Sequence, residues 1–523
     1  MRTPAPASIE FLPKPVSLVA PRKFSFLGVE HELRTASDWN QPSWDKLWLY
    51  HLHYFDDLNA SAEEGRRAWL LALLRRWIEE NPPGSGNGWE PYPLSLRLVN
   101  WVKWLLRLQA ASNGALQSAL GDEAFVGQLL HSLAVQARYL SRRLETHLLG
   151  NHLLANAKAL VFAGLFFAGD EADGWLQQGL ALVREQVPEQ VLADGGHFEL
   201  SPMYHAIVLE DLLDLVELAR CFPDAGITAA DVGEWKSAAS RMLAWLDAMS
   251  HPDGDIAFFN DAALGIASGL AALRGYAARM GVECAVGGAM RAVVRLADSG
   301  YIRIESGAAV GLLDVAAVGP DYLPGHAHAD TLTFELSLFG QRLLVNSGTS
   351  RYGESAERLR QRGTAAHNTV VVDGADSSEV WGGFRVARRA YPVGLQVRED
   401  GAGSISVSCA HDGYLRLPGR VEHRREWRFA AGELTVRDTL SGRFGHAEAR
   451  FHFHPAWNVS VGSDGRSGSA RLPDGQECRW EVSGGRARVD DSTYHPRFGS
   501  SIANRCLVVE FDGAEAMTVF RWG

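Results

Sequence analysis

The change in hydrophobic periodicity near residue 290 is the feature that most constrains the fold of this chain. Between about residue 44 and residue 288, apolar residues recur at spacings of three and four, as in SAEEGRRAWLLALLRRWIEE and MYHAIVLEDLLDLVELAR, which is the pattern of amphipathic helices. From Val293 onward, apolar and polar residues alternate over short runs such as TLTFELSLF and ELTVRDTL, which predicts β-strands. We therefore expect two structurally different domains.

The arrangement of these segments indicates a fold class. Eight or more consecutive helical segments, joined by short connections rich in Gly, Pro, Asp and Asn, pair into antiparallel hairpins that form either a ring or a linear solenoid. No fixed-length repeat is readable, which favours the ring, an α/α toroid. Eleven or more strands without intervening helices indicate a large antiparallel β-sandwich. The sequence thus predicts a multidomain α+β protein with an N-terminal extension (1–43), an α/α toroid (44–290) and a β-sandwich (291–523).

Composition excludes several classes of protein. The 523 residues carry a formal net charge of −11 at pH 7 and no basic run, so nucleic-acid binding is not expected. The five cysteines are scattered without a CxxC pair, which argues against a disulfide scaffold or a cysteine-rich metal site. No 18-residue apolar stretch is free of charge, so no membrane span is predicted. The N-terminus lacks the apolar core of a secretion signal, which predicts a cytoplasmic protein, with a periplasmic location by an unrecognised route as the alternative.

Two polar motifs open predicted helices in the first half of the chain. The sequence SPMYH, residues 201–205, reads as a helix start with serine as N-cap and proline in the first turn. Tyr204 and His205 then lie in the first turn, where the helix dipole favours a phenolate; the alternative for Tyr204 is an amphipathic packing residue. Asn151 and His152 open a second helix, NHLLANAKALVF. Asn151 there either caps the helix or, as a neutral donor, binds a carboxylate.

The second half begins with GHAHAD, residues 325–330. If His326 and His328 start a strand, their side chains point to opposite faces, so that one faces a cleft and the other a buried site. His367 follows in AAHNTVVVDG, and Asp330 can orient either imidazole. The alternative is that each histidine is a satisfied polar residue of the sandwich. A cleft between the two predicted domains would bring these residues to the polar motifs of the helical half.

These motifs, in this order, resemble the heparinase II/III-like polysaccharide lyases. The resemblance rests on GNHLLANAKAL, ELSPMYH, GHAHADTLTFELSLFGQRLLVNSGTSRYG and RGTAAHNTVVVDG, with WEPYPLSLRLVNW near residue 89 as a further match. It implies an α/α toroid followed by a β-sandwich, and an enzyme that cleaves a uronic-acid-containing glycan by β-elimination. The expected partner is an anionic polysaccharide or oligosaccharide, linked to exopolysaccharide or capsule metabolism, and the oligomeric state is left open.

The resemblance also implies a role for each matching residue. Asn151 would neutralise the uronate carboxylate, with His152 beside it in the cleft. Tyr204 would act as the acid, and for one substrate epimer also as the base, and His326 would complete the base set. From their chemistry, Arg97, Arg358 and Arg362 are further candidates to bind substrate carboxylates or sulfates through forked hydrogen bonds, with surface or interdomain salt bridges as the alternative for each. Glu199 and His205 are also expected to contact the substrate.

A zinc ion is the one cofactor that the resemblance implies. His328 and His367 match two of its ligands, and the third position, usually Asp, is occupied here by Asn346. A neutral amide is a much poorer zinc ligand than a carboxylate. Zinc binding is therefore expected to be weak or absent unless Asp330 or a water substitutes.

Two other functions fit a chain of this kind. Toroids of paired helices also form glycoside hydrolases, which need two carboxylic acids flanking a bond; the candidates are Glu199, Asp194, Asp255 and Asp261. A non-catalytic glycan-binding or scaffold protein of the same fold is the third possibility, and Asn346 is compatible with it. Only elimination produces a conjugated unsaturated uronate, so ultraviolet absorbance of the product distinguishes these classes.

Overall fold

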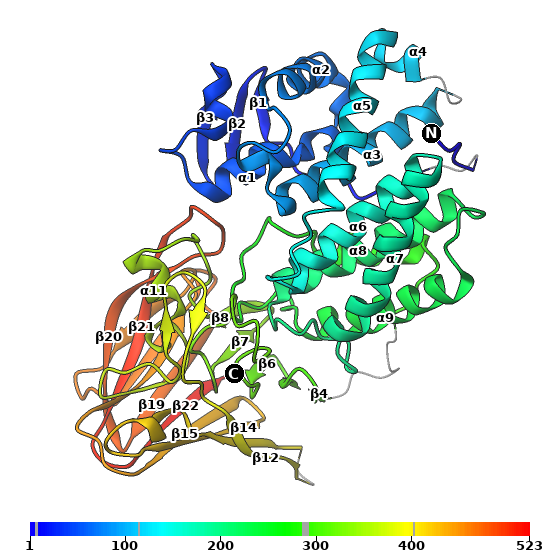
Figure 1. The fold of residues 1–523 in the computed structure, drawn as a ribbon. Helices are drawn as coiled ribbons and strands as arrows, with labels where there is room; N and C mark the ends of the chain where they lie inside the picture. The colour runs from blue at the N-terminus through cyan, green and yellow to red at the C-terminus, as the bar shows by residue number, and fades with distance from the viewer. Residues whose placement is uncertain (6–8, 113–115, 285–291, 401–402) are drawn as a thin grey trace. The chain divides into compact units, whose positions relative to one another are not determined.

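The computed structural model describes residues 1–5, 9–112, 116–284, 292–400 and 403–523 (Figure 1). The chain divides into two compact units. The first comprises Met1–Val191, Val208–Ser240 and Ala272–Glu283, and the second comprises Leu192–Ile207, Arg241–Ala271 and Cys284–Gly523. The predicted domain division at residue 290 stays a prediction, because two segments of the helical half group with the strands.

In its described residues, the first unit combines helices with a small sheet near the N-terminus. The antiparallel strands β1 (Leu18–Ala20), β2 (Lys23–Phe26) and β3 (Val29–Glu32) form that sheet. The helices of this unit are α1 (Lys46–Tyr54), α2 (Glu63–Glu80), α3 (Pro91–Ala111), α4 (Leu116–Leu120), α5 (Glu123–Leu140), α6 (Gly150–Phe166) and α7 (Asp170–Gln190), with 3-10 turns η1 (Ala36–Asn40), η2 (Asp56–Asn59) and η3 (Asn87–Trp89). Three further helices begin in one unit and end in the other: α8 (Pro202–Cys221), α9 (Ala229–Ala248) and α10 (Leu270–Arg279).

Helix α6 illustrates why these segments pair. Almost every side chain from Gly150 to Phe166 is buried, so the helix packs on all sides, as expected of a core helix. Gly164 and Gly179 allow α6 and α7 to approach closely, because a Cβ at either position would come within 3 Å of main-chain atoms of the other helix. Within the described part of the chain, no helix has both the length and the apolar character that crossing a membrane requires.

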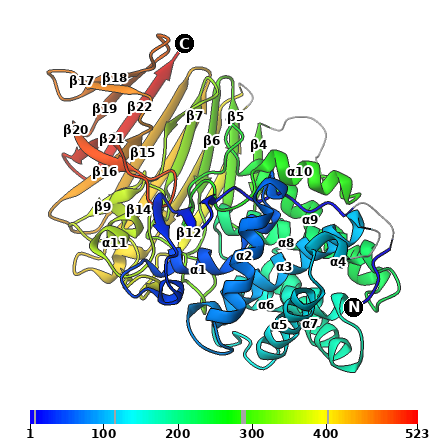
Figure 2. The same ribbon diagram turned by 90° about the horizontal axis from the view of Figure 1, so that it is seen from above.

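The second unit contains two large antiparallel sheets (Figure 2). The strand order of the first is β12-β13-β14-β15-β22-β19-β18-β17, and that of the second is β20-β21-β16-β8-β7-β6-β5-β4, with β9 paired to β16. The strands are β4 (Val293–Leu296), β5 (Tyr301–Ser306), β6 (Ala309–Asp314), β7 (Phe334–Leu338), β8 (Gln341–Leu344), β9 (Val370–Val372), β12 (Pro392–Glu399), β13 (Ile405–His411), β14 (Glu422–Ala430), β15 (Glu433–Ser441), β16 (Ala447–Phe453), β17 (Asn458–Val461), β18 (Ser467–Arg471), β19 (Glu477–Ser483), β20 (Gly485–Tyr494), β21 (Ile502–Phe511) and β22 (Glu515–Trp522).

One hydrophobic core joins the two sheets. Leu336 and Phe451 contribute from one sheet, and Trp427 and Phe520 contribute from the other. Burial alternates along β14 and β15, as expected for strands with one face on a core. The predicted fold class, a helical toroid followed by an antiparallel sandwich, is confirmed.

A second hydrophobic core packs two segments of the helical half, Leu192–Ile207 and Arg241–Ala271, against strands of the second unit. Leu200, Trp245 and Phe259 pack with Tyr301 and Leu312 of strands β5 and β6. The start of α8 and the end of α9 are thereby held against the edge of the larger sheet. This packing places Tyr204 and the GHAHAD motif in the same compact unit.

Candidate functional site

The start of helix α8 positions Tyr204. Pro202 is the first residue of the helix, and the Oγ of Ser201 accepts a hydrogen bond from the Tyr204 N–H at 3.2 Å. The same hydroxyl donates to the carbonyl of Asp261 at 2.5 Å, while the N–H of Asp261 donates to the carbonyl of His326 at 3.0 Å. The predicted helix start is therefore present, and main-chain contacts of Asp261 link it to the histidine segment.

Tyr204 and His326 lie face to face. Their ring centroids are 3.9 Å apart with an interplanar angle of 30°. The hydroxyl of Tyr204 is 2.9 Å from that of Tyr352, and the His326 side chain remains 14% exposed. A phenol and an imidazole in contact, at the positive end of a helix, form a pair suited to proton transfer.

Asp261 holds both histidines of the GHAHAD motif. Its Oδ2 lies 2.9 Å from Nδ1 of His326, its Oδ1 lies 2.9 Å from Nε2 of His328, and Arg358 binds both oxygens. Burial by itself would raise the pKa of Asp261, but Arg358 and the two imidazoles hold it well below its ordinary value. An ionised carboxylate only accepts hydrogen bonds. His326 therefore carries its proton on Nδ1, and Nε2 is available as a base.

This contact corrects the expectation that the two histidines point to opposite faces. Residues 326–328 are not in a strand; the chain turns before and after them, with hydrogen bonds from Ala327 N to Pro324 O and from Thr333 N to Asp330 O. The alternation of side chains that a strand would impose is absent. Both rings consequently reach the same carboxylate.

His328 and His367 form the core of a candidate metal centre. Nδ1 of His328 and Nε2 of His367 are 3.3 Å apart, and one ligand atom from each of His328, Asp330 and His367 lies within 4.8 Å of the other two. Burial lowers the pKa of His328 to about 4 and that of His367 well below its ordinary value, so both rings are neutral, as metal ligands must be. The donor set of two imidazoles and one carboxylate fits a zinc ion.

Asn346 takes a different position from the one expected of a third ligand. Its Oδ1 lies 3.0 Å from Nδ1 of His367, the nitrogen that faces away from His328. It also accepts a hydrogen bond from Thr333 at 2.8 Å. Asn346 thus orients the His367 ring from the side opposite His328, and the carboxylate that groups with the two histidines is that of Asp330.

The structure does not support a substrate contact for Arg358 or Arg362. Both side chains are fully buried on helix α11 (Ala356–Arg362). Arg358 binds Asp261 and the carbonyl of Gly383, and Arg362 binds the carbonyl of Ala327 at 3.0 Å. Because they are four residues apart, they lie on one face of the helix, and that face is internal.

The structure places Glu199 in the candidate site and His205 outside it. The Oε2 of Glu199 lies 3.6 Å from Nε2 of His326, so this carboxylate belongs to the candidate site. The His205 ring is fully buried against Trp245, 4.3 Å away, and its Nε2 lies 2.8 Å from the carbonyl of Met242. Burial lowers the pKa of His205 to about 3. His205 is a packing residue and not the predicted substrate contact.

Asn151 and His152 belong to the first unit. Helix α6 begins at Gly150, and its N-cap residue, Leu149, provides no side-chain hydrogen bond; Asn151 therefore does not cap the helix. The His152 ring is partly exposed, 4.3 Å from the ring of Tyr92, and its Nδ1 is 3.1 Å from Glu145. Their predicted convergence with Tyr204 and His326, which lie in the second unit, stays a prediction.

Arg97, also in the first unit, is not exposed to a ligand. Its side chain is fully buried in α3, with Nε donating to Gln136 at 2.9 Å and the guanidinium 3.9 Å from the ring centre of Trp77. Such an arginine stabilises helix packing. Because Gln136, Trp77 and the carbonyl of His53 surround the guanidinium, the structure does not support the predicted substrate contact.

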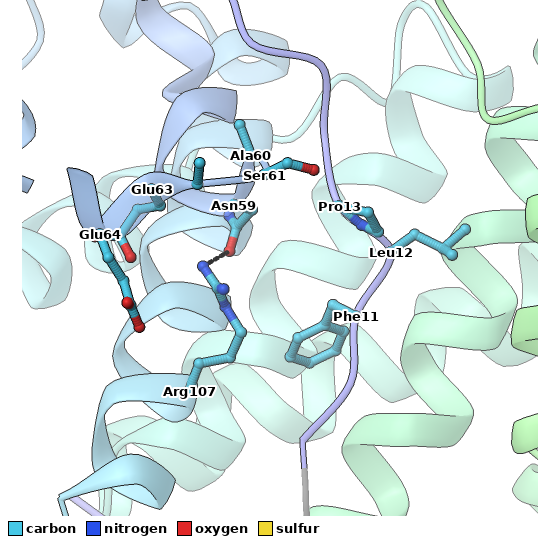
Figure 3. A pocket seen from close by; sticks show the side chains of 10 residues that line it. Phe11, Leu12, Pro13, Asn59, Ala60, Ser61, Glu63, Glu64 and Arg107 are labelled. Carbon is cyan, nitrogen blue, oxygen red and sulfur yellow. Dashed lines mark hydrogen bonds between the residues drawn. The ribbon is translucent and has the colours of Figure 1, made fainter. Parts of the chain in front are cut away.

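A cavity of about 370 Å³ in the first unit contains none of the predicted site residues (Figure 3). It is lined by Phe11, Leu12, Pro13, Asn59, Ala60, Ser61, Ala62, Glu63, Glu64 and Arg107. Arg107 donates a hydrogen bond to Asn59 at 3.2 Å, and Glu63 accepts a hydrogen bond from Arg67. Because none of the predicted catalytic residues lines this cavity, we place the candidate active site at Tyr204 and His326.

Comparison with known proteins gives the context of this geometry. Two family models match: "Heparinase II/III N-terminus" over residues 38–278 and "Heparinase II/III-like, C-terminal" over residues 289–523. The heparin-sulfate lyase of Pedobacter heparinus is 26% identical over 342 residues, which cover 60% of this chain and 48% of the relative. The chain thus spans about half the length of that relative.

Another relative covers more of the chain. The FtsZ-localized protein C of Caulobacter vibrioides is 28% identical over 451 residues, which cover 81% of this chain and 72% of the relative. Among solved structures, heparinase III superposes with a TM-score of 0.71 at 17% identity, covering 91% of this chain and 76% of that one. The heparan sulfate lyase HepC mutant from Pedobacter heparinus gives 0.63 at 19%, covering 96% and 81%. At these identities the structures support the fold alone.

Proposed function

This chain belongs to the heparinase II/III-like family, and we propose on that premise that it is a polysaccharide lyase that cleaves a uronic-acid-containing glycan by β-elimination. The observation that carries the proposal is the stacking of Tyr204 on His326, 3.9 Å apart, beside a second phenol. An anionic exopolysaccharide or capsule polymer is the proposed class of substrate.

The pair supplies the two proton transfers that elimination needs. His326 Nε2, or the Tyr204 phenolate, takes the proton from C5 of the uronate, and the C4–C5 double bond forms as the C4–O bond breaks. Tyr204 returns a proton to the departing oxygen. Asp261 holds the His326 ring by Nδ1, and the Tyr352 hydroxyl, 2.9 Å away, is placed to donate to a Tyr204 phenolate.

Elimination also requires that the uronate carboxylate be neutralised, because the C5 proton is otherwise too weakly acidic. We propose Asn151 for this task on the family resemblance, which matches it to the asparagine in that role. A donor that stabilises developing charge in this way contributes about 3 to 4 kcal/mol.

The candidate metal centre is a second part of the proposal. His328, Asp330 and His367 would hold a zinc ion. Such an ion would supply a fixed positive charge beside the segment that carries His326. Asp261 and Asn346 orient the two imidazoles from the nitrogens opposite to the ligand atoms.

Hydrolysis is less well supported than elimination, because three of the four candidate carboxylates are unsuited to act as its acid or base. Asp261 is bound by Arg358 and its pKa is held well below its ordinary value, so it is no general acid. Asp194 accepts hydrogen bonds from Ser299 and Asp298, and Asp255 is exposed on a turn. This leaves Glu199 without the second carboxylic acid that the reaction needs.

A non-catalytic role is the remaining alternative, because the Caulobacter relative, named for its localisation with FtsZ, covers more of this chain than the lyases do. Incubating the protein with a panel of uronate polymers, heparan sulfate first, separates the two. A rise in the ultraviolet absorbance of unsaturated uronate supports the lyase. Tight binding of a polymer without that rise would support the non-catalytic role.

A further inference from the structure

A small hairpin beside the candidate active site presents exposed aromatic side chains. Its strands, β10 (Val380–Trp381) and β11 (Arg385–Val386), pair antiparallel. On one face, Val380 and Val386 pack against Val318 and Ala327. Trp381 and Phe384 are instead 56% and 40% exposed. Large aromatic groups on a surface commonly mark a binding site.

Buried arginines hold this hairpin in place. Two-residue strands are too short to be stable alone, but Arg358 donates to the carbonyl of Gly383 at 3.1 Å, and Arg362 donates to those of Gly382 at 3.3 Å and Arg385 at 3.2 Å. Arg358 also binds Asp261, which holds His326. The exposed tip is therefore tied to the proposed base.

The tip also borders the reacting groups directly. The Phe384 ring centre is 5.3 Å from that of Tyr352 and 6.1 Å from that of His326. The Tyr352 hydroxyl contacts that of Tyr204. A sugar unit next to the one being cleaved would consequently reach the hairpin.

An exposed cation adjoins the aromatic side chains. Arg385 lies opposite Trp381 in the hairpin register, and both alternate with the inward-facing valines. Arg388 and Arg389 pair with Glu379 and Asp321. Among the described residues, no ion pair involves Arg385. An indole that stacks on a sugar ring beside a free guanidinium suits an acidic sugar.

We propose that Trp381, Phe384 and Arg385 form a subsite for an acidic pyranose unit of the glycan, adjacent to the unit that is cleaved. This subsite rests on the proposed function in so far as its ligand is a stretch of the same polymer. Its contribution is to binding, because none of the three residues transfers a proton.

The test uses the full chain and a heparan sulfate oligosaccharide of defined length. Trp381 is the one exposed tryptophan among the described residues, so its emission should change on binding. Trp381→Ala should remove that change and weaken binding by roughly tenfold, and Arg385→Gln should weaken binding of this oligosaccharide but not of a neutral one of equal length. Tyr391→Ala, which also removes an exposed aromatic ring, and Arg388→Gln are the matched controls and should bind like the parent.

The outcomes separate the subsite from the lyase proposal. Weaker binding by Trp381→Ala, in a protein whose parent forms unsaturated product, supports both. Weaker binding in a protein that forms no unsaturated product supports the subsite and contradicts the lyase. Equal binding by parent and Trp381→Ala overturns the subsite, whatever the parent cleaves. A parent that binds no acidic oligosaccharide overturns it as well.

Discussion

Asp261 accepts hydrogen bonds from His326 and from His328, so one residue sets the tautomers of both rings. In the parent, ¹⁵N NMR of the imidazoles should show His326 protonated on Nδ1 and His328 protonated on Nε2. Asp261→Asn keeps the shape but removes one acceptor. It should lower the rate of unsaturated product formation by about 10- to 100-fold.

Asp261→Asn removes the carboxylate that pairs with Arg358, so this variant could fail to fold. The NMR measurement uses the parent protein and tests the tautomer assignment independently of the variant. Asp194→Asn, which changes a carboxylate bonded to Ser299 in the same unit, is the control and should keep the parent's rate. A parent spectrum with His326 protonated on Nε2 alone would contradict the assignment.

Asn346 provides the second prediction at this scale. A carboxylate at this position would hold the Nδ1 proton of His367 more firmly than the amide does, which makes the opposite nitrogen a better ligand. Asn346→Asp should therefore raise zinc affinity by about tenfold or more, measured by calorimetry with zinc alone. His367→Ala should abolish the binding. Equal affinity in Asn346→Asp and parent would show that the amide already serves as well as a carboxylate.

Helix α8 carries the prediction at the scale of an element. Ser201 caps the helix and also binds the main chain of Asp261. Ser201→Ala should cost about 1 kcal/mol of stability, lowering Tm by about 1 to 2 °C. It should also reduce product formation because Tyr204 loses its fixed position. Asp122→Ala removes the cap of α5 and should lower Tm without affecting the reaction. If both variants kept full activity, the cap would have no part in positioning Tyr204.

At the same scale, the sequence predicts elements better than it predicts contacts between them. The Ser201 cap and the buried course of α6 follow from local patterns, and the structure has both. The contact of Asp261 with His326 joins residues 65 positions apart, and no local pattern encodes such a contact. Tyr352 lies in one of the family motifs, but nothing else in the sequence predicts its contact with Tyr204. Substrate contacts are predicted for Arg358 and Arg362 because the sequence alone does not distinguish a buried arginine from a substrate-binding one.

For the whole molecule, buried histidines predict how stability depends on pH. Burial lowers the pKa of His53, His205 and His452 to about 3, from 6.5 when exposed. The unfolded chain therefore binds protons that the folded chain excludes, so stability is full above pH 6.5 and falls as pH decreases toward the folded-state pKa. Each such residue contributes up to about 1.4 kcal/mol per pH unit. Tm should drop between about pH 7 and pH 5; a Tm that stays level or rises would contradict this burial.

The central claim is that Tyr204 and His326 together catalyse elimination, and the product of Tyr204→Phe tests it most directly. The substitution removes one oxygen and preserves the ring that stacks on His326, so folding and glycan binding should stay near the parent's. On a polymer that the parent cleaves, formation of unsaturated uronate should fall by about 100- to 10,000-fold. Full activity of Tyr204→Phe on that polymer would contradict the account and would assign the chemistry to other groups.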